Sequence, residues 1–147
     1  MAVHPRKTIR NKIITLLKAG VTSASNRVYD FRTQPAQTAP FINVTTPSDE
    51  PDLEDFVGLS TPNYMRILTV EIHCVETERP SSGTLSGDAD DFAREVEEAL
   101  ADNITLDGLA LSCLLSTTTL EAGDEVDPPA FSVILTYEVK YSDTLGN

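Results

Sequence analysis

Strict alternation between apolar and polar side chains constrains the fold of this chain more than any other feature. The alternation covers residues 65–76 and 131–141, and a third stretch covers residues 109–119. A period of two places every second side chain on the same face of a β-strand, so each stretch predicts a strand with one apolar face. These faces are expected to carry Leu68, Val70, Ile72, Cys74, Leu109, Leu111, Cys113, Leu115, Val133 and Leu135. We expect the three strands to be antiparallel and the last two to form a long C-terminal hairpin.

Helical periodicity marks two further stretches, residues 5–19 and 88–102. Pro5 suits the first position of a helix, and Gly20 suits the left-handed residue that follows one. Asp88 is a candidate N-cap for the second helix. At 100° per residue each helix gathers one apolar stripe for the core. The stripes comprise Ile9, Ile13, Leu16 and Leu17 in the first helix and Phe92, Val96, Ala99 and Leu100 in the second.

Short strand signals at residues 28–32 and 41–45 complete the pattern. Residues 46–63 hold three prolines and five acids, and residues 120–130 are also acidic, so we predict flexible loops at both places. The chain is therefore expected to be α+β, with two helices packed on an antiparallel or mixed sheet. Its 147 residues suit one domain, residues 1–147.

The charge distribution is strongly polarised along the chain. Residues 1–32 hold seven bases and one acid, whereas the remaining 115 residues hold four bases and 22 acids, and the net charge is −12. This balance argues against a free-standing nucleic-acid binder, which is normally basic. No apolar run approaches the roughly 20 residues that span a bilayer, and no signal-like apolar segment occurs near Met1. We expect a soluble, non-exported domain in which Cys74 and Cys113 are buried free thiols.

Residues for catalysis are sparse. His4 and His73 are the only imidazoles, and no phosphate loop, zinc-binding helix or nucleophile elbow is found. The acidic run at residues 124–127 lacks the glycine and the final glutamate of a calcium loop, so we interpret it as a solvated loop, with weak Mg²⁺ or Ca²⁺ binding as the alternative. We therefore expect no enzyme activity, no catalytic residues, no cofactor and no metal site.

The first helix carries a candidate subunit interface. Ile14 projects away from the apolar stripe, among Lys7, Arg10 and Lys18. An apolar residue ringed by bases suggests a contact surface for another subunit, and a solvated basic helix face is the alternative.

Five segments, in this order, resemble a known family. They are residues 28–32 (VYDFR), 40–44 (PFINV), 68–73 (LTVEIH), 90–100 (DDFAREVEEAL) and 135–139 (LTYEV). Together they are similar to the tail terminator proteins of long-tailed bacteriophages, the minor tail protein U family typified by phage lambda. The resemblance extends over nearly the whole chain but contains no single signature motif. The long acidic stretch after residue 46 departs from the family pattern.

The resemblance implies a structural virion protein that assembles in the host cytoplasm. Such a protein caps the completed tail tube as a hexameric ring, ends tube polymerisation and forms the surface for head attachment. Its partners would be other copies of itself, the tail tube protein and connector proteins of the neck. It would bind no membrane and no specific nucleic-acid sequence, although DNA would pass through the ring. The alternatives are a head-closure or head–tail connector protein, and a small ligand-binding domain or enzyme using His73 and Glu71.

Overall fold

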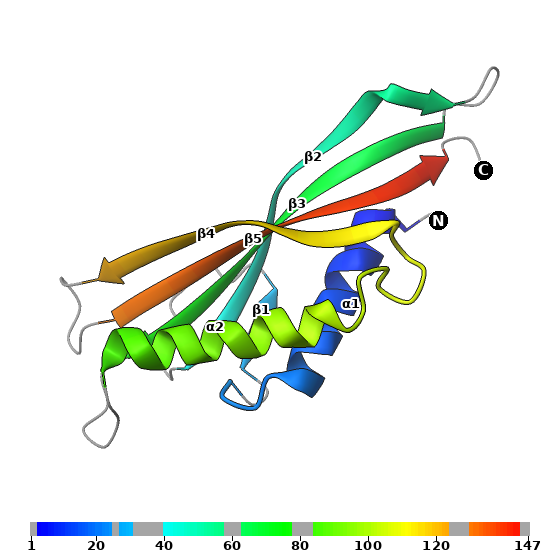
Figure 1. Cartoon of the computed structure of the whole chain (residues 1–147). Helices are drawn as coiled ribbons and strands as arrows, with labels where there is room; N and C mark the ends of the chain where they lie inside the picture. Colours follow the sequence, from blue (N-terminus) through cyan, green and yellow to red (C-terminus); the bar gives the residue numbers. More distant parts are fainter. Residues whose placement is uncertain are drawn as a thin grey trace.

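The structure is a computed structural model of the chain, and it describes residues 3–24, 27–30, 40–57, 63–77, 84–123 and 130–144. Its elements are, in order, α1 (Pro5–Gly20), β1 (Val28–Asp30), β2 (Phe41–Val57), β3 (Asn63–Thr77), α2 (Leu85–Ala101), β4 (Ser112–Gly123) and β5 (Ala130–Thr144). They form an α+β fold with one five-stranded sheet in the order β1-β2-β3-β5-β4 (Figure 1). The predicted fold class and C-terminal hairpin are confirmed.

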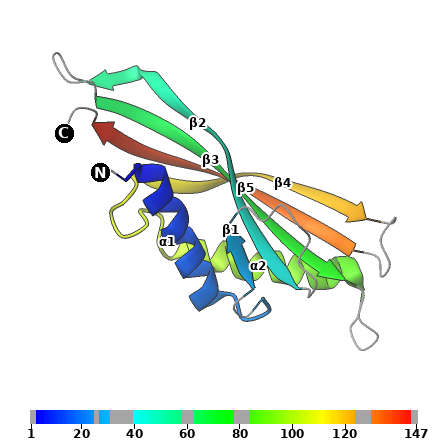
Figure 2. The same cartoon turned by 180° about the vertical axis from the view of Figure 1, so that it is seen from behind.

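The sheet is mixed because its shortest strand is parallel to its neighbour. β1 runs parallel to β2, and the pairs β2–β3, β3–β5 and β5–β4 are antiparallel. Both helices lie on the same side of the sheet, and the ends of β2, β3 and β5 extend beyond α1 (Figures 1 and 2). The other face of the sheet has no helix from the described residues.

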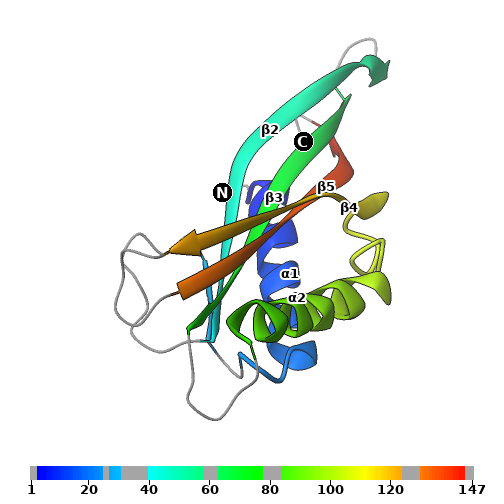
Figure 3. The same ribbon diagram turned by 60° about the vertical axis from the view of Figure 1, so that its left-hand side comes forward.

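The core lies between the helices and the alternating faces of β3 and β5. Ile72 of β3 pairs with Leu135 of β5, and both side chains are fully buried against the helices. The two helices cross beneath the sheet, as Figure 3 shows. Their buried apolar residues are Ile9, Ile13 and Leu17 of α1 and Ala89, Phe92, Ala93, Val96 and Leu100 of α2. The predicted apolar stripes therefore face this core, with Leu16 and Ala99 only partly buried at its border.

The acidic stretch predicted as a loop is largely a strand. Residues 46–57 form the second half of β2 and pair with β3, while residues 58–62 lie outside the described part of the chain. A register shift between Thr45 and Ser48 accommodates Pro47. Proline is tolerated there because this half of β2 has no described strand on its outer side, so no ladder hydrogen bond is lost. At the second predicted loop, residues 120–123 and 130 belong to strands, and residues 124–129 are not described.

The prediction that the leucines of residues 109–119 are buried is wrong. Leu109 and Leu111 precede β4 and are exposed, and Leu115 is exposed within the strand. Of the four residues expected on this apolar face, only Cys113 is buried. β4 is an edge strand, whereas α2 packs on β3 and β5. The alternation places Leu115 opposite Tyr137 on the helix side of the sheet, but no described helix covers it there.

The start of α1 is as predicted, whereas its end and the start of α2 differ from the prediction. Pro5 is indeed the first residue of α1, and His4 is its N-cap. Gly20 is helical rather than left-handed, and Val21 is the C-cap of α1. In α2 the N-cap is Thr84, whose hydroxyl accepts a hydrogen bond from the Gly87 amide, while Asp88 lies in the first turn.

Candidate interaction surface

Three of the five basic residues of α1 are neutralised within the chain. Arg6 pairs with Asp49 of β2 at 3.0 Å, and Arg10 pairs with Asp30 of β1 at 2.9 Å. Lys12 pairs with Asp107 in the turn after α2, and this contact lowers the pKa of the Asp107 carboxyl. These bases hold α1 against its surroundings and are not available to a partner.

The other two basic residues, Lys7 and Lys18, are exposed, and no ion pair joins either to another described residue. They were predicted to form a subunit interface with Arg10 and Ile14. Arg10 instead serves an internal ion pair, and its guanidinium also donates to the Thr46 hydroxyl at 3.3 Å. Of this predicted set, the structure leaves two lysines open to solvent.

The burial of Ile14 differs from the sequence prediction. It is half-buried and packs against the core rather than projecting into solvent. At 100° per residue it lies about 60° from Leu17, at the border of the main apolar stripe, and β1 also packs beside α1.

A buried ionic cluster ties the first turn of α1 to the sheet. The Asp49 side chain is only 6% exposed, and its Oδ2 lies 3.0 Å from Arg6 and 3.9 Å from Arg66. The Tyr141 hydroxyl donates a hydrogen bond to the same oxygen at 2.6 Å. Burial and this hydrogen bond raise the pKa of Tyr141. Arg66 also pairs with Asp143 at 3.0 Å. The cluster neutralises two buried carboxylates and is structural.

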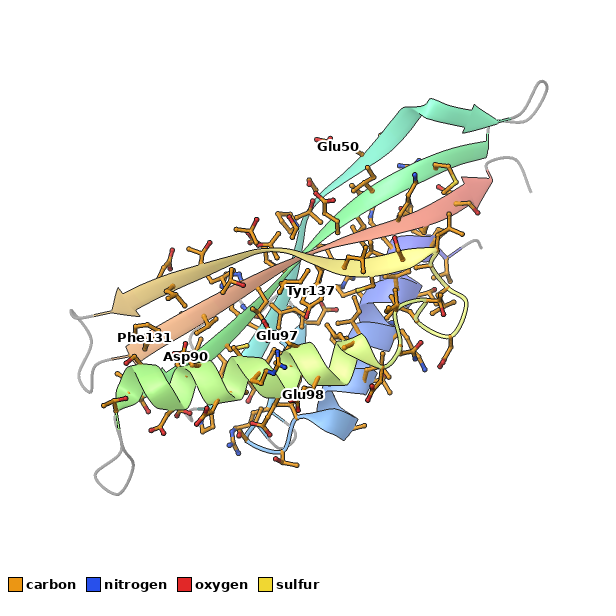
Figure 4. All side chains as sticks on the ribbon, viewed as in Figure 1. Glu50, Asp90, Glu97, Glu98, Phe131 and Tyr137 are labelled. Carbon is orange, nitrogen blue, oxygen red and sulfur yellow. The ribbon has the colours of Figure 1, made fainter. Side chains whose placement is uncertain are left out.

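An apolar groove lies between α2 and β4, where sequence analysis had placed no site. Its volume is about 330 Å³, and Leu100, Cys113 and Tyr137 form its buried floor. The exposed side chains of Leu114 and Leu115 border it from β4. Figure 4 shows Tyr137 between the sheet and α2, with Glu97 and Glu98 on the helix. The remaining lining residues are Arg94, Glu97, Glu98, Ala101 and Ile104.

One sequence signal could have indicated this groove. Leu114 and Leu115 are consecutive apolar residues within an alternating stretch, and both are exposed, at 54% and 42%. A register shift follows between Leu115 and Thr117. A break in alternation is the sequence mark of a β-bulge, and bulges commonly occur on edge strands.

The residues considered for chemistry do not form a catalytic constellation in the described chain. The imidazole of His73 lies 3.5 Å from the Glu71 carboxylate, and both are partly exposed on the helix-free face of the sheet. Cys74 and Cys113 are buried free thiols, as predicted, and burial raises the pKa of both. No group of three or more metal-ligating side chains occurs among the described residues. The acidic run at residues 124–127 lies outside them.

No helix in the described part of the chain is long and apolar enough to cross a membrane. Neither a protein-family model nor a curated protein matches the sequence. Among solved structures, the fold is similar to that of a chain from the virion of a native gene transfer agent (GTA) particle. The TM-score is 0.53 and the sequence identity 8%, with 97% of this chain and 100% of that chain covered. This chain therefore shares its fold with a chain of a gene transfer agent particle over nearly their whole lengths.

Proposed function

We propose that this protein is a structural component of a phage-like virion. The observation that carries the proposal is the likeness of fold, over 97% of this chain, to a chain of a gene transfer agent particle. The resemblance of five sequence segments to phage tail terminators points independently in the same direction.

Within the virion, we assign the protein to the head-proximal end of the tail. There it caps the completed tube as a ring of six copies, stops the addition of tube subunits and forms the surface that joins the head. The groove between α2 and β4 supports a role in assembly, because an open apolar groove on a protein surface commonly marks a contact with another protein. This assignment includes no enzyme activity and no cofactor.

Deletion of the gene tests the proposal, with tails viewed by negative-stain electron microscopy. Loss of a tail terminator should give headless tails longer than normal, since nothing ends tube polymerisation. A plasmid copy of the gene should restore normal tail length. Tails of normal length beside heads that leak DNA would instead identify a head-closure or connector protein. Normal virions after deletion would refute a structural role.

A further inference from the structure

The exposed large apolar side chains of the described residues are concentrated in one region. Of the seven, only Val3 lies elsewhere, and the other six occur in the turn after α2 or on β4. These six are Ile104, Leu109, Leu111, Leu114, Leu115 and Leu120. A region so rich in exposed leucine is expected to be covered in the working assembly. Leu114 and Leu115 border the groove, which makes the groove the natural point of attachment.

The rim of the groove is acidic. Its lining includes the carboxylates of Glu97 and Glu98 and one base. That base, Arg94, pairs within its own helix with Glu97 at 3.3 Å and Glu98 at 3.4 Å. The groove thus combines an apolar interior with excess negative charge at its edge. A complementary partner would present lysine or arginine beside an apolar side chain.

The α1 helix of the same chain presents such a surface. Lys7 and Lys18 are eleven positions apart, which places them only about 20° apart around the helix axis. Val3, the seventh exposed apolar residue, lies outside α1, directly before its N-cap His4 and at the same end as Lys7. We name these three residues the lysine stripe. It carries the two α1 bases that form no ion pair with other described residues.

We propose that the groove of one copy receives the lysine stripe of a second copy. This inference rests on the proposed function, and it names the surfaces by which ring subunits meet. Because the stripe and the groove are different surfaces, each copy uses both, and the contact can repeat around a closed ring instead of ending at a dimer. The register shift after Leu115 interrupts the regular edge of β4, which favours a helix in the groove over an added strand.

Sedimentation velocity of the full chain over a concentration series tests the groove. Leu115→Asp places a charge at the groove, and we expect it to raise the concentration needed for half-assembly at least tenfold. Leu120→Asp is the matched control, because Leu120 is an exposed leucine of the same strand outside the groove. It should change that concentration by less than twofold. Thermal melts of both variants check that they fold. Unchanged assembly of Leu115→Asp, or equal loss in the control, would overturn the inference.

A charge exchange tests the stripe. The double variant Lys7→Glu/Lys18→Glu should raise the half-assembly concentration at least tenfold. Adding Glu98→Lys to it should lower that concentration again at least threefold. The control is Glu138→Lys in place of Glu98→Lys, which makes the same change of charge on the helix-free face of β5. It should leave the half-assembly concentration of the double variant unchanged. Equal recovery by both additions would mean that net charge alone governs assembly, and the proposed contact would be wrong.

Failure of this inference can be distinguished from failure of the proposed function. A native chain that stays monomeric at every concentration overturns the contact between copies. If Leu115→Asp restores normal tail length in the deletion strain and assembles normally, the groove contact is wrong while tail termination stands. If deletion leaves tail length normal, tail termination fails, whatever sedimentation shows.

Discussion

At the scale of single residues, Gly20 shows how one missing side chain positions two helices. A Cβ atom at Gly20 would lie 2.9 Å from the Cβ of Ala99 in α2. Carbon atoms that are not bonded to each other repel strongly at that distance, so glycine here permits close approach of the helices. The sequence suggested a left-handed turn for this glycine, which is a different role for the same residue.

We expect Gly20→Val to lower the free energy of unfolding by about 1–3 kcal/mol, because the larger side chain forces α1 away from α2. Ala19→Val is the control, since Ala19 is exposed and the change there costs only helix propensity, about 0.5 kcal/mol. Urea denaturation measures both. Equal losses would show that the contact with Ala99 is unimportant.

Cys113 provides a second prediction at this scale. Burial raises the pKa of its thiol to about 11 from an ordinary value of 9.0. Above pH 9 the thiol ionises in the unfolded chain while the folded chain keeps its proton. The stability that this group contributes is therefore complete below pH 9 and is lost as the pH rises toward 11.

The expected slope for one such proton is at most about 1.4 kcal/mol per pH unit. Cys113→Ala should reduce the fall in unfolding free energy between pH 9 and pH 11 relative to the native chain. The other buried thiol and the buried tyrosines remain in both proteins, so the comparison isolates Cys113. Parallel pH profiles for the two proteins would contradict the prediction.

At the scale of elements, Asp49 explains how an acidic segment becomes part of a strand. In a loop its carboxylate would be solvated, but here Arg6, Arg66 and Tyr141 replace the water. These contacts tie the second half of β2 to α1, β3 and β5 at once. Composition alone predicted a loop because it cannot include partners that lie far away in the sequence.

We expect Asp49→Asn to lower the free energy of unfolding by about 2–3 kcal/mol, because two guanidinium groups lose a largely buried counter-charge. The expected loss of unfolding free energy is smaller than for a fully buried ion pair, because Arg6 is partly exposed. Hydrogen exchange of residues 46–52 should also accelerate. Glu50→Gln is the control: Glu50 is exposed, as Figure 4 shows, and should change stability by less than about 0.5 kcal/mol. Equal effects of the two variants would rule out the ionic cluster as the cause.

At the scale of the whole molecule, net charge should oppose the proposed association. Each copy carries −12, so copies in the proposed ring would repel one another over long distances. Salt at about 0.15 M screens charges beyond about 8 Å, whereas a close lysine–carboxylate contact covered by apolar side chains is screened less. We expect a rise from about 10 mM to about 150 mM NaCl to increase the assembled fraction, and millimolar Mg²⁺ to increase it further. Sedimentation across a salt series measures this. Rings that dissociate as salt rises would show that exposed ion pairs dominate.

The sequence by itself determined the features that depend on neighbours along the chain. The alternating faces of residues 65–76 and 131–141 and the apolar stripes of both helices follow from periods of 2 and 3.6 residues. They face the core as predicted, with Leu16, Ala99 and Phe131 only partly buried at its border. The exposure of Lys7 and Lys18 follows from the same helical period.

Tertiary structure alone decided which of these surfaces are covered. Ile14 is half-buried at the border of the core, and Leu115 is exposed because β4 is at the sheet edge, beyond the strands on which α2 packs. Residues 46–57 are a strand because their backbone pairs with β3 and because the Asp49 carboxylate finds its partners in the ionic cluster. Periodicity specifies the direction in which a side chain points, but burial also requires a second element on that side, and the position of that element depends on contacts distant in sequence.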